Sequence, residues 1–345
     1  MDTNFDINFT LNENSFSSVN ELLSFARIHV SSIYPFLFQW FSADEFTVKT
    51  SGSTGKPKQI KLKKQQLLNS ALATSKFFEL PKKTTALLCL SPDYIAGKMM
   101  LVRALALGWH LDVVQPDLNP LKHNTKNYDF CAMAPMQVEN SLDEINRIKK
   151  LIVGGGVVSK TLQNKLQKVK TKVFATYGMT ETITHIAVKK LNQSKTILLF
   201  YQVLPDVKIY QDKRNCLVIA APKVSDTLII TNDVVQLISD KQFEWLGRYD
   251  TIINSGGIKL QPEEIEEKLS TIISRRFFVS GVSDDRLGQK LILIIEGQQY
   301  KVAFNQVKNL TKYEIPKEVY FIDTFVETET KKIQRKKTLD ILFKK

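Results

Sequence analysis

The segment FTVKTSGSTGKPKQIKL, from Phe46 to Leu62, contains the loop that decides how this chain is interpreted. Apolar and β-branched residues at Phe46–Lys49 and Ile60–Leu62 predict short strands on either side of Thr50–Lys58. In the loop, glycines let the backbone approach a ligand, hydroxyl groups add hydrogen-bond donors and lysines add positive charge. The loop therefore predicts a polyphosphate site, although Ser, Gly and Pro are also ordinary residues of a hairpin turn.

Two common phosphate-binding motifs do not fit the glycine spacing. In a P-loop four residues separate the glycines, whereas here only Ser53-Thr54 separates Gly52 from Gly55. The run Gly154–Gly156 lacks the third glycine that a dinucleotide fingerprint requires. Neither a P-loop nor a dinucleotide-binding turn is therefore expected.

Length and composition indicate a globular protein that can bury a sizeable core. With 345 residues, 43% of them hydrophobic, two domains are favoured over one. The cysteines Cys89, Cys131 and Cys216 form no CxxC pair, so neither a disulfide framework nor a zinc site is expected. No signal-peptide pattern and no membrane-length apolar run is present, which predicts a cytoplasmic protein without membrane insertion.

The net charge of +13 suits partners that carry negative charge. Nucleic acid, a membrane surface and anionic small molecules all satisfy that description. The lysines are spread along the chain except for a basic cluster at 331–337, and no basic stripe is interleaved with exposed aromatic residues. The sequence therefore favours anionic small molecules and predicts no nucleic-acid partner.

Apolar runs alternate with helix-like segments through the first half of the chain. Continuous apolar strands separated by helices predict an α/β fold with a largely parallel, doubly wound sheet. The expected strands are Ala86–Leu90, Leu111–Val114, Phe130–Ala134, Leu151–Val153 and Val173–Thr176. The expected helices are one opened by a capping box at Ser18 and Glu21, then Lys64–Phe78, Ile95–Leu107, Met136–Arg147 and Ser159–Val169.

The pattern changes after Leu198, where strand-like runs follow one another closely. They predict a small antiparallel, barrel-like part with strands at Val207–Tyr210, Leu217–Ala220, Leu228–Ile230 and Val234–Ile238. After Gly247–Asp250, Pro262 begins an acidic helix, and further strands are expected at Phe277–Val282 and Leu291–Glu296. We therefore expect a large domain at residues 1–249 and a smaller α+β domain at 250–345.

The loop at Thr50–Lys58 resembles the signature loop of the adenylate-forming superfamily, which includes acyl-CoA synthetases, peptide-synthetase adenylation domains and luciferases. Further segments match that superfamily in the same order: YGMTET at Tyr177–Thr182, the turn Thr231–Asp233, GRYDTIINSGGIKLQPEEIE at Gly247–Glu266 and TKKIQRKKTL from Thr330. The resemblance implies an enzyme that uses ATP to activate a carboxylic acid as its acyl-adenylate. It also implies ATP and acyl sites in the large domain and a mobile small domain.

The resemblance assigns ATP to several segments: Thr50, Ser51, Gly52, Ser53, Thr54, Gly55 and Lys58 at the phosphates, Gly154, Gly155, Gly156 and Tyr177 at adenine, and Asp233 and Arg248 at the ribose. Thr180 is expected at the α-phosphate and Glu181 at Mg²⁺, a hard cation that prefers oxygen ligands. Outside this family context Glu181 is an ordinary first-turn helix residue, Asp233 a turn residue and Tyr177 a core residue.

In the small domain, the resemblance places a catalytic lysine at Lys332, where it reaches the carboxylate and the α-phosphate. Lys331 stands where the family has glycine, so the choice between Lys331 and Lys332 stays open, and a solvated basic tail is the alternative. Asp250 matches the hinge residue of the family. Gly256 and Gly257 are expected to line the route of the CoA thiol.

Two basic residues, Lys98 and Arg103, lie in the otherwise apolar segment Leu90–Leu107, which matches the acyl-pocket region of the family. Because unpaired charge is costly to bury, they predict an acid with a second carboxylate. The alternative is that both side chains extend to solvent. Other members of the superfamily have a longer subdomain before the phosphate loop, so we expect a truncated N-terminal subdomain and a compact acid.

SPDYIAGKMM from Ser91 and MAPMQVEN from Met133 are similar to the short bacterial o-succinylbenzoate-CoA ligases of menaquinone biosynthesis. That resemblance implies that 2-succinylbenzoate, ATP and CoA give 2-succinylbenzoyl-CoA, AMP and pyrophosphate. Activation of another small aromatic or dicarboxylic acid is one alternative. The others are a free-standing adenylation domain that loads a carrier protein and a non-catalytic descendant that binds nucleotide or RNA.

Overall fold

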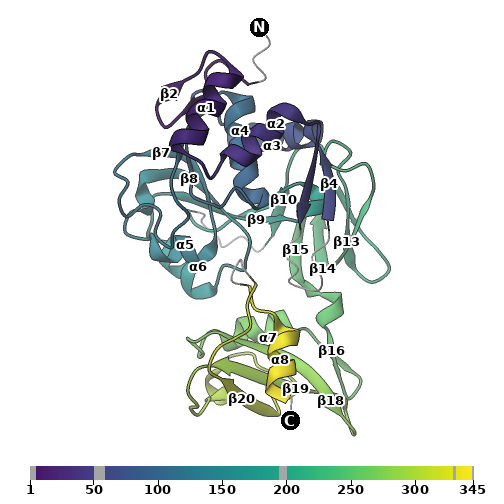
Figure 1. Ribbon diagram of the computed structural model, residues 1–345. Helices are drawn as coiled ribbons and strands as arrows, with labels where there is room; N and C mark the ends of the chain where they lie inside the picture. Colours follow the sequence, from purple (N-terminus) through teal and green to yellow (C-terminus); the bar gives the residue numbers. More distant parts are fainter. Residues whose placement is uncertain (1–4, 50–58, 194–199, 329–331, 344–345) are drawn as a thin grey trace.

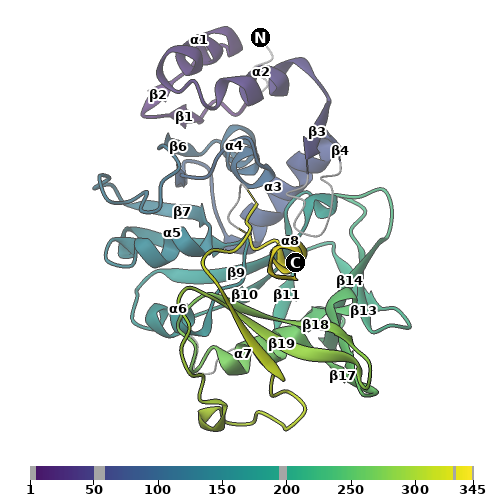
Figure 2. The ribbon, with the colours of Figure 1, turned by 60° about the horizontal axis from the view of Figure 1, so that its bottom comes forward.

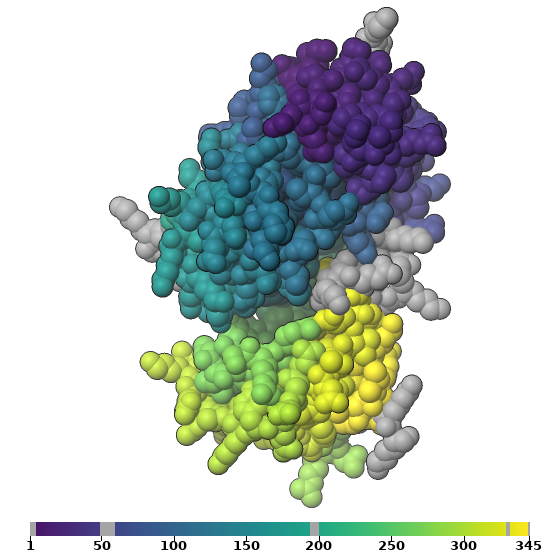
Figure 3. Space-filling view, turned by 60° about the vertical axis from the view of Figure 1, so that its left-hand side comes forward, coloured from purple at the N-terminus to yellow at the C-terminus, as the bar shows by residue number. Residues whose placement is uncertain are grey.

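The computed structural model describes residues 5–49, 59–193, 200–328 and 332–343, arranged as a larger and a smaller lobe (Figure 1). In this part of the chain the strands form a 13-stranded sheet, a 5-stranded sheet and a 2-stranded hairpin. A waist separates the lobes in the space-filling view (Figure 3). Within the described ranges, no helix has the length and apolar character that crossing a membrane requires.

One half of the large sheet is parallel, with neighbouring strands in the order β9-β8-β7-β5-β6-β1. Its strands are β1 (Thr10–Leu11), β5 (Thr85–Leu88), β6 (His110–Val113), β7 (Tyr128–Met133), β8 (Ile148–Val153) and β9 (Lys172–Gly178), with β2 (Asn14–Ser15) at the edge. Strands β5 to β9 overlap the apolar runs that predict them, with ends that differ by at most three residues, because a strand covered on both faces is apolar throughout.

Helices cover both faces of this parallel half, as a doubly wound sheet requires. The core on one face includes Ala86 and Leu88, and the helices that pack into it are α1 (Val19–His29), α2 (Tyr34–Ser42), α3 (Lys64–Phe78) and α4 (Ile95–Leu107). The other core includes Leu87 and Cys89 and receives α5 (Pro135–Asn140) and α6 (Lys160–Leu166). Alternate residues of β5 therefore serve opposite cores, and the predicted fold class is confirmed.

The predicted helix at Met136–Arg147 is wrong in its length. The helix α5 ends at Asn140, and after a series of turns a short 3₁₀ helix, η1 (Ile145–Arg147), follows. Ser141 is buried, and its hydroxyl donates to Asn119 Oδ1 at 3.1 Å. A polar residue that bonds outside the helix favours a break there, while the apolar spacing still buries Val138 and Ile145.

The other half of the large sheet is antiparallel and joins the parallel half directly through β9 and β10. Its strands are β10 (His185–Lys190), β11 (Tyr201–Val203), β12 (Lys208–Gln211), β13 (Cys216–Ala220), β14 (Ile229–Ser239) and β15 (Gln242–Arg248). The predicted turn at Thr231–Asp233 is wrong, because these residues lie inside β14. Asp233 pairs with Arg248 there, next to an irregularity in register at Val234 and Val235.

The smaller lobe has its own sheet and its own cores. Its sheet has the order β17-β16-β19-β18, with β20 beside β19. Its elements are η3 (Tyr249–Thr251), β16 (Ile253–Ser255), β17 (Ile258–Leu260), α7 (Pro262–Leu269), β18 (Phe277–Asp284), β19 (Gly288–Glu296), η4 (Phe304–Gln306), β20 (Glu318–Ile322) and α8 (Arg335–Phe343). The new sheet begins at Ile253, and a domain boundary at 249/250 stays a prediction.

Candidate active site

The predicted phosphate loop, Thr50–Lys58, lies outside the described residues. The strands on either side of it, β3 (Glu45–Lys49) and β4 (Gln59–Lys63), pair in antiparallel register. Lys49 lies opposite Gln59 and Val48 opposite Ile60, so the hairpin holds the two ends of the loop side by side. The predicted strands at this position are confirmed.

The glycine run after β8 approaches the neighbouring strand closely. A Cβ atom on Gly154 would lie 2.5 Å from the Oγ1 atom of Thr176 in β9, a distance at which the neighbour must move. Gly155 has φ +79°, a conformation that glycine adopts far more readily than other residues. Gly155 and Gly156 are exposed, so this turn presents backbone to solvent at the end of a parallel strand, where ligands bind in such sheets.

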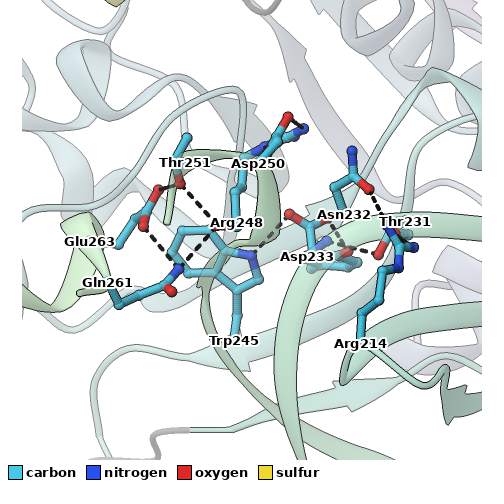
Figure 4. Close-up of polar contacts among 11 residues, drawn as sticks. Arg214, Thr231, Asn232, Asp233, Trp245, Arg248, Asp250, Thr251, Gln261 and Glu263 are labelled. Carbon is cyan, nitrogen blue, oxygen red and sulfur yellow. Dashed lines mark hydrogen bonds and ion pairs between the residues drawn. The ribbon is translucent and has the colours of Figure 1, made fainter. Parts of the chain in front are cut away.

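Tyr177 and Asp233 form a hydrogen-bonded pair across the large sheet. The Tyr177 hydroxyl in β9 donates to Asp233 Oδ2 at 2.6 Å. Trp245 Nε1 in β15 donates to Asp233 Oδ1 at 3.2 Å (Figure 4). Burial and the nearby Asp233 charge raise the pKa of Tyr177 well above its usual range, so the phenol stays protonated. Each carboxylate oxygen has a second lone pair, so Asp233 retains capacity to accept from further hydroxyl groups.

Arg248 forms a two-bonded ion pair with Asp250 at the junction between the lobes. Its Nε and Nη2 atoms each donate to one oxygen of Asp250 at 2.8 Å (Figure 4). The Asp250 side chain raises the pKa of Arg248, and Arg248 lowers that of Asp250. From the smaller lobe, Gln261 Nε2 donates to the Arg248 carbonyl at 3.3 Å. The predicted ribose ligand and the predicted hinge residue therefore contact each other directly.

Thr180 and Glu181 lie in the short 3₁₀ helix η2 (Thr180–Thr182), directly after β9. Thr180 is half-buried, and Glu181 is exposed. Among the described residues no group of three His, Cys, Asp or Glu side chains could enclose a metal ion. A single exposed carboxylate fits Mg²⁺, which usually keeps water and substrate oxygens in its coordination shell.

Arg103 is the most unusual side chain near this segment. It lies in α4 and is only 2% exposed, so it does not extend to solvent. Its Nη2 atom donates to Thr184 Oγ1 at 3.3 Å and its Nη1 atom lies 3.6 Å from Met100 Sδ. Within the described ranges its Nε atom has no hydrogen-bond partner, and no acidic residue pairs with the guanidinium. Burial lowers its pKa from its usual range to about 9.

Lys98 has a different environment from Arg103, although both lie in α4. Its Nζ atom donates to the carbonyls of Pro92 and Asp93 at 2.6 and 2.8 Å. It also lies 5.7 Å from the centre of the Phe36 ring. These contacts hold the loop before α4 in place. A role in substrate binding stays a prediction for Lys98.

The residues predicted in the smaller lobe lie on two segments. Gly256 and Gly257, with φ +59° and +82°, form the two-residue turn between β16 and β17, where positive φ requires glycine. Lys332 is half-buried, and burial lowers its pKa. In Figures 1 and 2 the chain on the approach to α8 extends from the smaller lobe toward the larger one.

Three side chains of this region carry no motif that could identify them from sequence. Trp245 binds Asp233 from the next strand, and Thr184 and His185 meet Arg103 across a separation of about 80 residues in the chain. The signal in the sequence for Thr184 and His185 is their position just after the YGMTET segment. Their roles depend on tertiary contacts, which periodicity does not report.

The larger lobe combines a mixed sheet with a glycine turn after β8 and polar residues on β9, η2 and β14, and a second lobe follows it. This arrangement is the fold of an adenylate-forming enzyme. Residues 47–211 match the family described as AMP-binding enzyme. The crystal structure of an acyl-CoA synthetase (AMP-forming)/AMP-acid ligase II-like protein from Dyadobacter fermentans is 37% identical, with coverage of 90% of this chain and 94% of that one and a TM-score of 0.60. The chain therefore belongs to the AMP-binding enzymes.

Further similarity is to enzymes named for one acid. A 2-succinylbenzoate–CoA ligase of Bacillus cytotoxicus is 25% identical over 338 residues, 86% of this chain and 70% of the relative. The O-succinylbenzoate CoA synthetase of Bacillus subtilis in complex with ATP and magnesium ion is 21% identical, with a TM-score of 0.76 over 85% of this chain and 69% of that chain. The fold expected from the superfamily resemblance is confirmed.

Proposed function

We propose that this protein is an AMP-forming acid–thiol ligase that converts 2-succinylbenzoate, ATP and CoA into 2-succinylbenzoyl-CoA, AMP and pyrophosphate. The observation that carries the proposal is Arg103, a buried guanidinium without an acidic partner in the described ranges. An isolated buried charge is costly, and a ligand carboxylate would neutralise it. The similarity to 2-succinylbenzoate–CoA ligases names a substrate with such a second carboxylate.

The first half-reaction joins the acid to the nucleotide. A carboxylate oxygen of the acid attacks the α-phosphorus of ATP, and pyrophosphate leaves as the acyl-adenylate forms. The acid is an anion that approaches a polyanion, so positive charge and hydrogen-bond donors at the phosphates are needed. We assign that task to the loop at Thr50–Lys58, to Thr180 and to Lys332, whose half-buried position strengthens its interaction with an anion.

The remaining nucleotide contacts follow from the geometry around Asp233. Its carboxylate would accept the ribose hydroxyls on lone pairs not taken by Tyr177 and Trp245. Glycines 154–156 would let adenine approach the backbone. Glu181 would hold Mg²⁺, which would neutralise charge on the phosphate oxygens when bound.

In the second half-reaction the thiol sulfur of CoA attacks the acyl carbon, the bond to AMP breaks and the thiol proton is released. We propose that the smaller lobe turns between the two half-reactions about Asp250, so that Lys332 leaves and Gly256–Gly257 approach. Such a rotation would open the ion pair between Arg248 and Asp250. We place the enzyme in the cytoplasm, where ATP and CoA are available.

The test is a panel of acids offered to purified protein with ATP, Mg²⁺ and CoA. Pyrophosphate release reports adenylation, and thioester formation reports the whole reaction. The panel contains 2-succinylbenzoate, benzoate, malonate and a medium-chain fatty acid. The proposal predicts the highest kcat/KM with 2-succinylbenzoate, whereas efficient thioester formation only from the other acids would contradict it. Pyrophosphate release without any CoA thioester would favour a domain that loads a carrier protein.

A further inference from the structure

The chain after Glu181 makes a strained turn. Ile183 has φ +66° and ψ −65°, and the Thr184 N–H donates to the Thr182 carbonyl at 2.7 Å. This is a γ-turn with a β-branched residue at its centre, a rare and strained conformation. Such strain persists only where the surroundings fix it, so the position of the following residues is tightly determined.

Several contacts impose this conformation. The Thr182 hydroxyl accepts from the Met179 N–H at 2.9 Å and donates to the Thr184 carbonyl at 2.6 Å. The Ile183 side chain is completely buried in the core beneath α3 and α4. On the other side of the turn, a Cβ atom on Gly178 would lie 2.2 Å from the Thr184 carbonyl oxygen. Only glycine at 178 permits the end of strand β9 to lie so close to the Thr184 backbone.

The turn places the Thr184 hydroxyl between two basic side chains. Its oxygen lies 3.3 Å from Arg103 Nη2 and 3.0 Å from His185 Nδ1. Arginine can only donate, so Thr184 accepts from Arg103 and its one proton is available to His185. His185 can accept that proton because burial, with a smaller contribution from the Arg103 charge, lowers its pKa to about 3 and keeps the ring neutral. The Thr184 hydroxyl also accepts from the backbone N–H of His185, so one of its two lone pairs remains for Arg103.

We propose that Thr184 and His185 are positioning residues that hold the Arg103 guanidinium for the second carboxylate of the acid, and so determine the preference for diacids over monoacids. This inference rests on the proposed function. Thr184 restrains one terminal nitrogen of Arg103, while the Nε atom is left without a partner. Thr184 is four residues after Thr180, so one short segment would contact the α-phosphate that the activated carboxylate attacks, through Thr180, and would position Arg103 for the other carboxylate, through Thr184.

The test compares Thr184→Val with Thr184→Ser on a diacid and on two monoacids. The monoacids are 4-phenyl-4-oxobutanoate and 2-acetylbenzoate, which each lack one carboxylate of 2-succinylbenzoate. Loss of a hydrogen bond to a charged group weakens a binding constant by roughly 10- to 100-fold. Thr184→Val should raise the KM for the diacid by about that factor with little change in kcat, and Thr184→Ser should restore it. The kcat/KM for monoacids should change less than about 3-fold.

Two further variants separate positioning from general damage to the fold. His185→Phe keeps a ring beside Phe78 and should raise the diacid KM less than Thr184→Val does. Thr171→Val is the matched control, because Thr171 is also buried and its hydroxyl only donates to the Ile145 carbonyl. It should leave both KM values unchanged.

The measurement is made on the diacid with the highest kcat/KM in the panel. An unchanged diacid KM in Thr184→Val, or an equal loss on diacids and monoacids, would overturn this inference while leaving the proposed function intact. A wild type that activates no diacid would overturn both. An unchanged preference for diacids in His185→Phe would restrict the positioning role to Thr184.

Discussion

Replacing Arg103 by methionine should make the ligand-free protein more stable while removing its response to the acid. The guanidinium is fully buried, its Nε atom is unpaired, and burial lowers its pKa from its usual range to about 9. A decrease of that size corresponds to about 5 kcal/mol at neutral pH, which is an upper bound on the penalty of burying the charge. Methionine fills a similar volume without charge. Loss of the hydrogen bond to Thr184 offsets about 1 kcal/mol of the stability gained by removing the charge.

Replacing a buried ion pair by apolar residues of similar volume is often neutral or stabilises a protein by about 1–4 kcal/mol, and a buried charge without an acidic partner gains even less from its surroundings. We therefore expect Arg103→Met to raise the free energy of unfolding by about 2 kcal/mol, and the melting temperature by about 4–8 °C. Because burial depresses the pKa of this basic group, the penalty is complete below pH 9 and declines as the pH rises above it. At pH 7.5 the comparison therefore reports the full penalty.

The assay is calorimetric unfolding at pH 7.5 without ligand and with 2-succinylbenzoate. At a hundred times its Kd, a ligand adds about 2.7 kcal/mol to the wild type, whereas it should add little to Arg103→Met. The order of stability should therefore reverse when the acid is added. Arg147→Met is the control, because Arg147 donates to the Leu121 and Asn124 carbonyls and its loss should destabilise. A ligand-free Arg103→Met less stable than the wild type would refute this reasoning.

Three other predictions concern His185, Lys332 and Asp233. His185 stays neutral when folded and is protonated below pH 6.5 when unfolded, so between pH 7.5 and 5.5 the wild type should lose about 1.4 kcal/mol more unfolding free energy than His185→Phe; equal losses in urea titrations would contradict this. Lys332→Ala should slow pyrophosphate release at least 100-fold but spare thioester formation from supplied acyl-adenylate, while exposed Lys336→Ala should leave both steps unchanged, and an unaffected first step would exclude Lys332. Asp233→Asn should raise the KM for ATP about 10-fold or more, and a KM that changes only for the acid would remove Asp233 from the nucleotide site.

The sequence predicts the parallel half of the large sheet well because each buried strand is a continuous apolar run. The helices Lys64–Phe78 and Ile95–Leu107 agree with the structure at both ends. Local signals failed where tertiary contacts decide. Thr231–Asp233 has the composition of a turn, but pairing of Asp233 with Arg248 keeps it in a strand.

The site was predictable only in part for the same reason. A motif identifies residues that are adjacent in sequence, such as Thr180 and Glu181. Arg103 and Thr184 are 81 positions apart in the sequence. Nothing in the sequence around one of them indicates that it contacts the other. The strain at Ile183 also follows from packing around Gly178, which sequence periodicity does not report.

The most direct test of the central claim is the identity of the product formed from 2-succinylbenzoate, ATP, Mg²⁺ and CoA. Mass spectrometry of the reaction should find 2-succinylbenzoyl-CoA with one AMP and one pyrophosphate per thioester, and Arg103→Met should reduce its formation far more than it reduces thioester formation from a monoacid. Formation of ADP and phosphate in place of AMP and pyrophosphate, or the absence of this thioester while another acid is converted efficiently, would contradict the account.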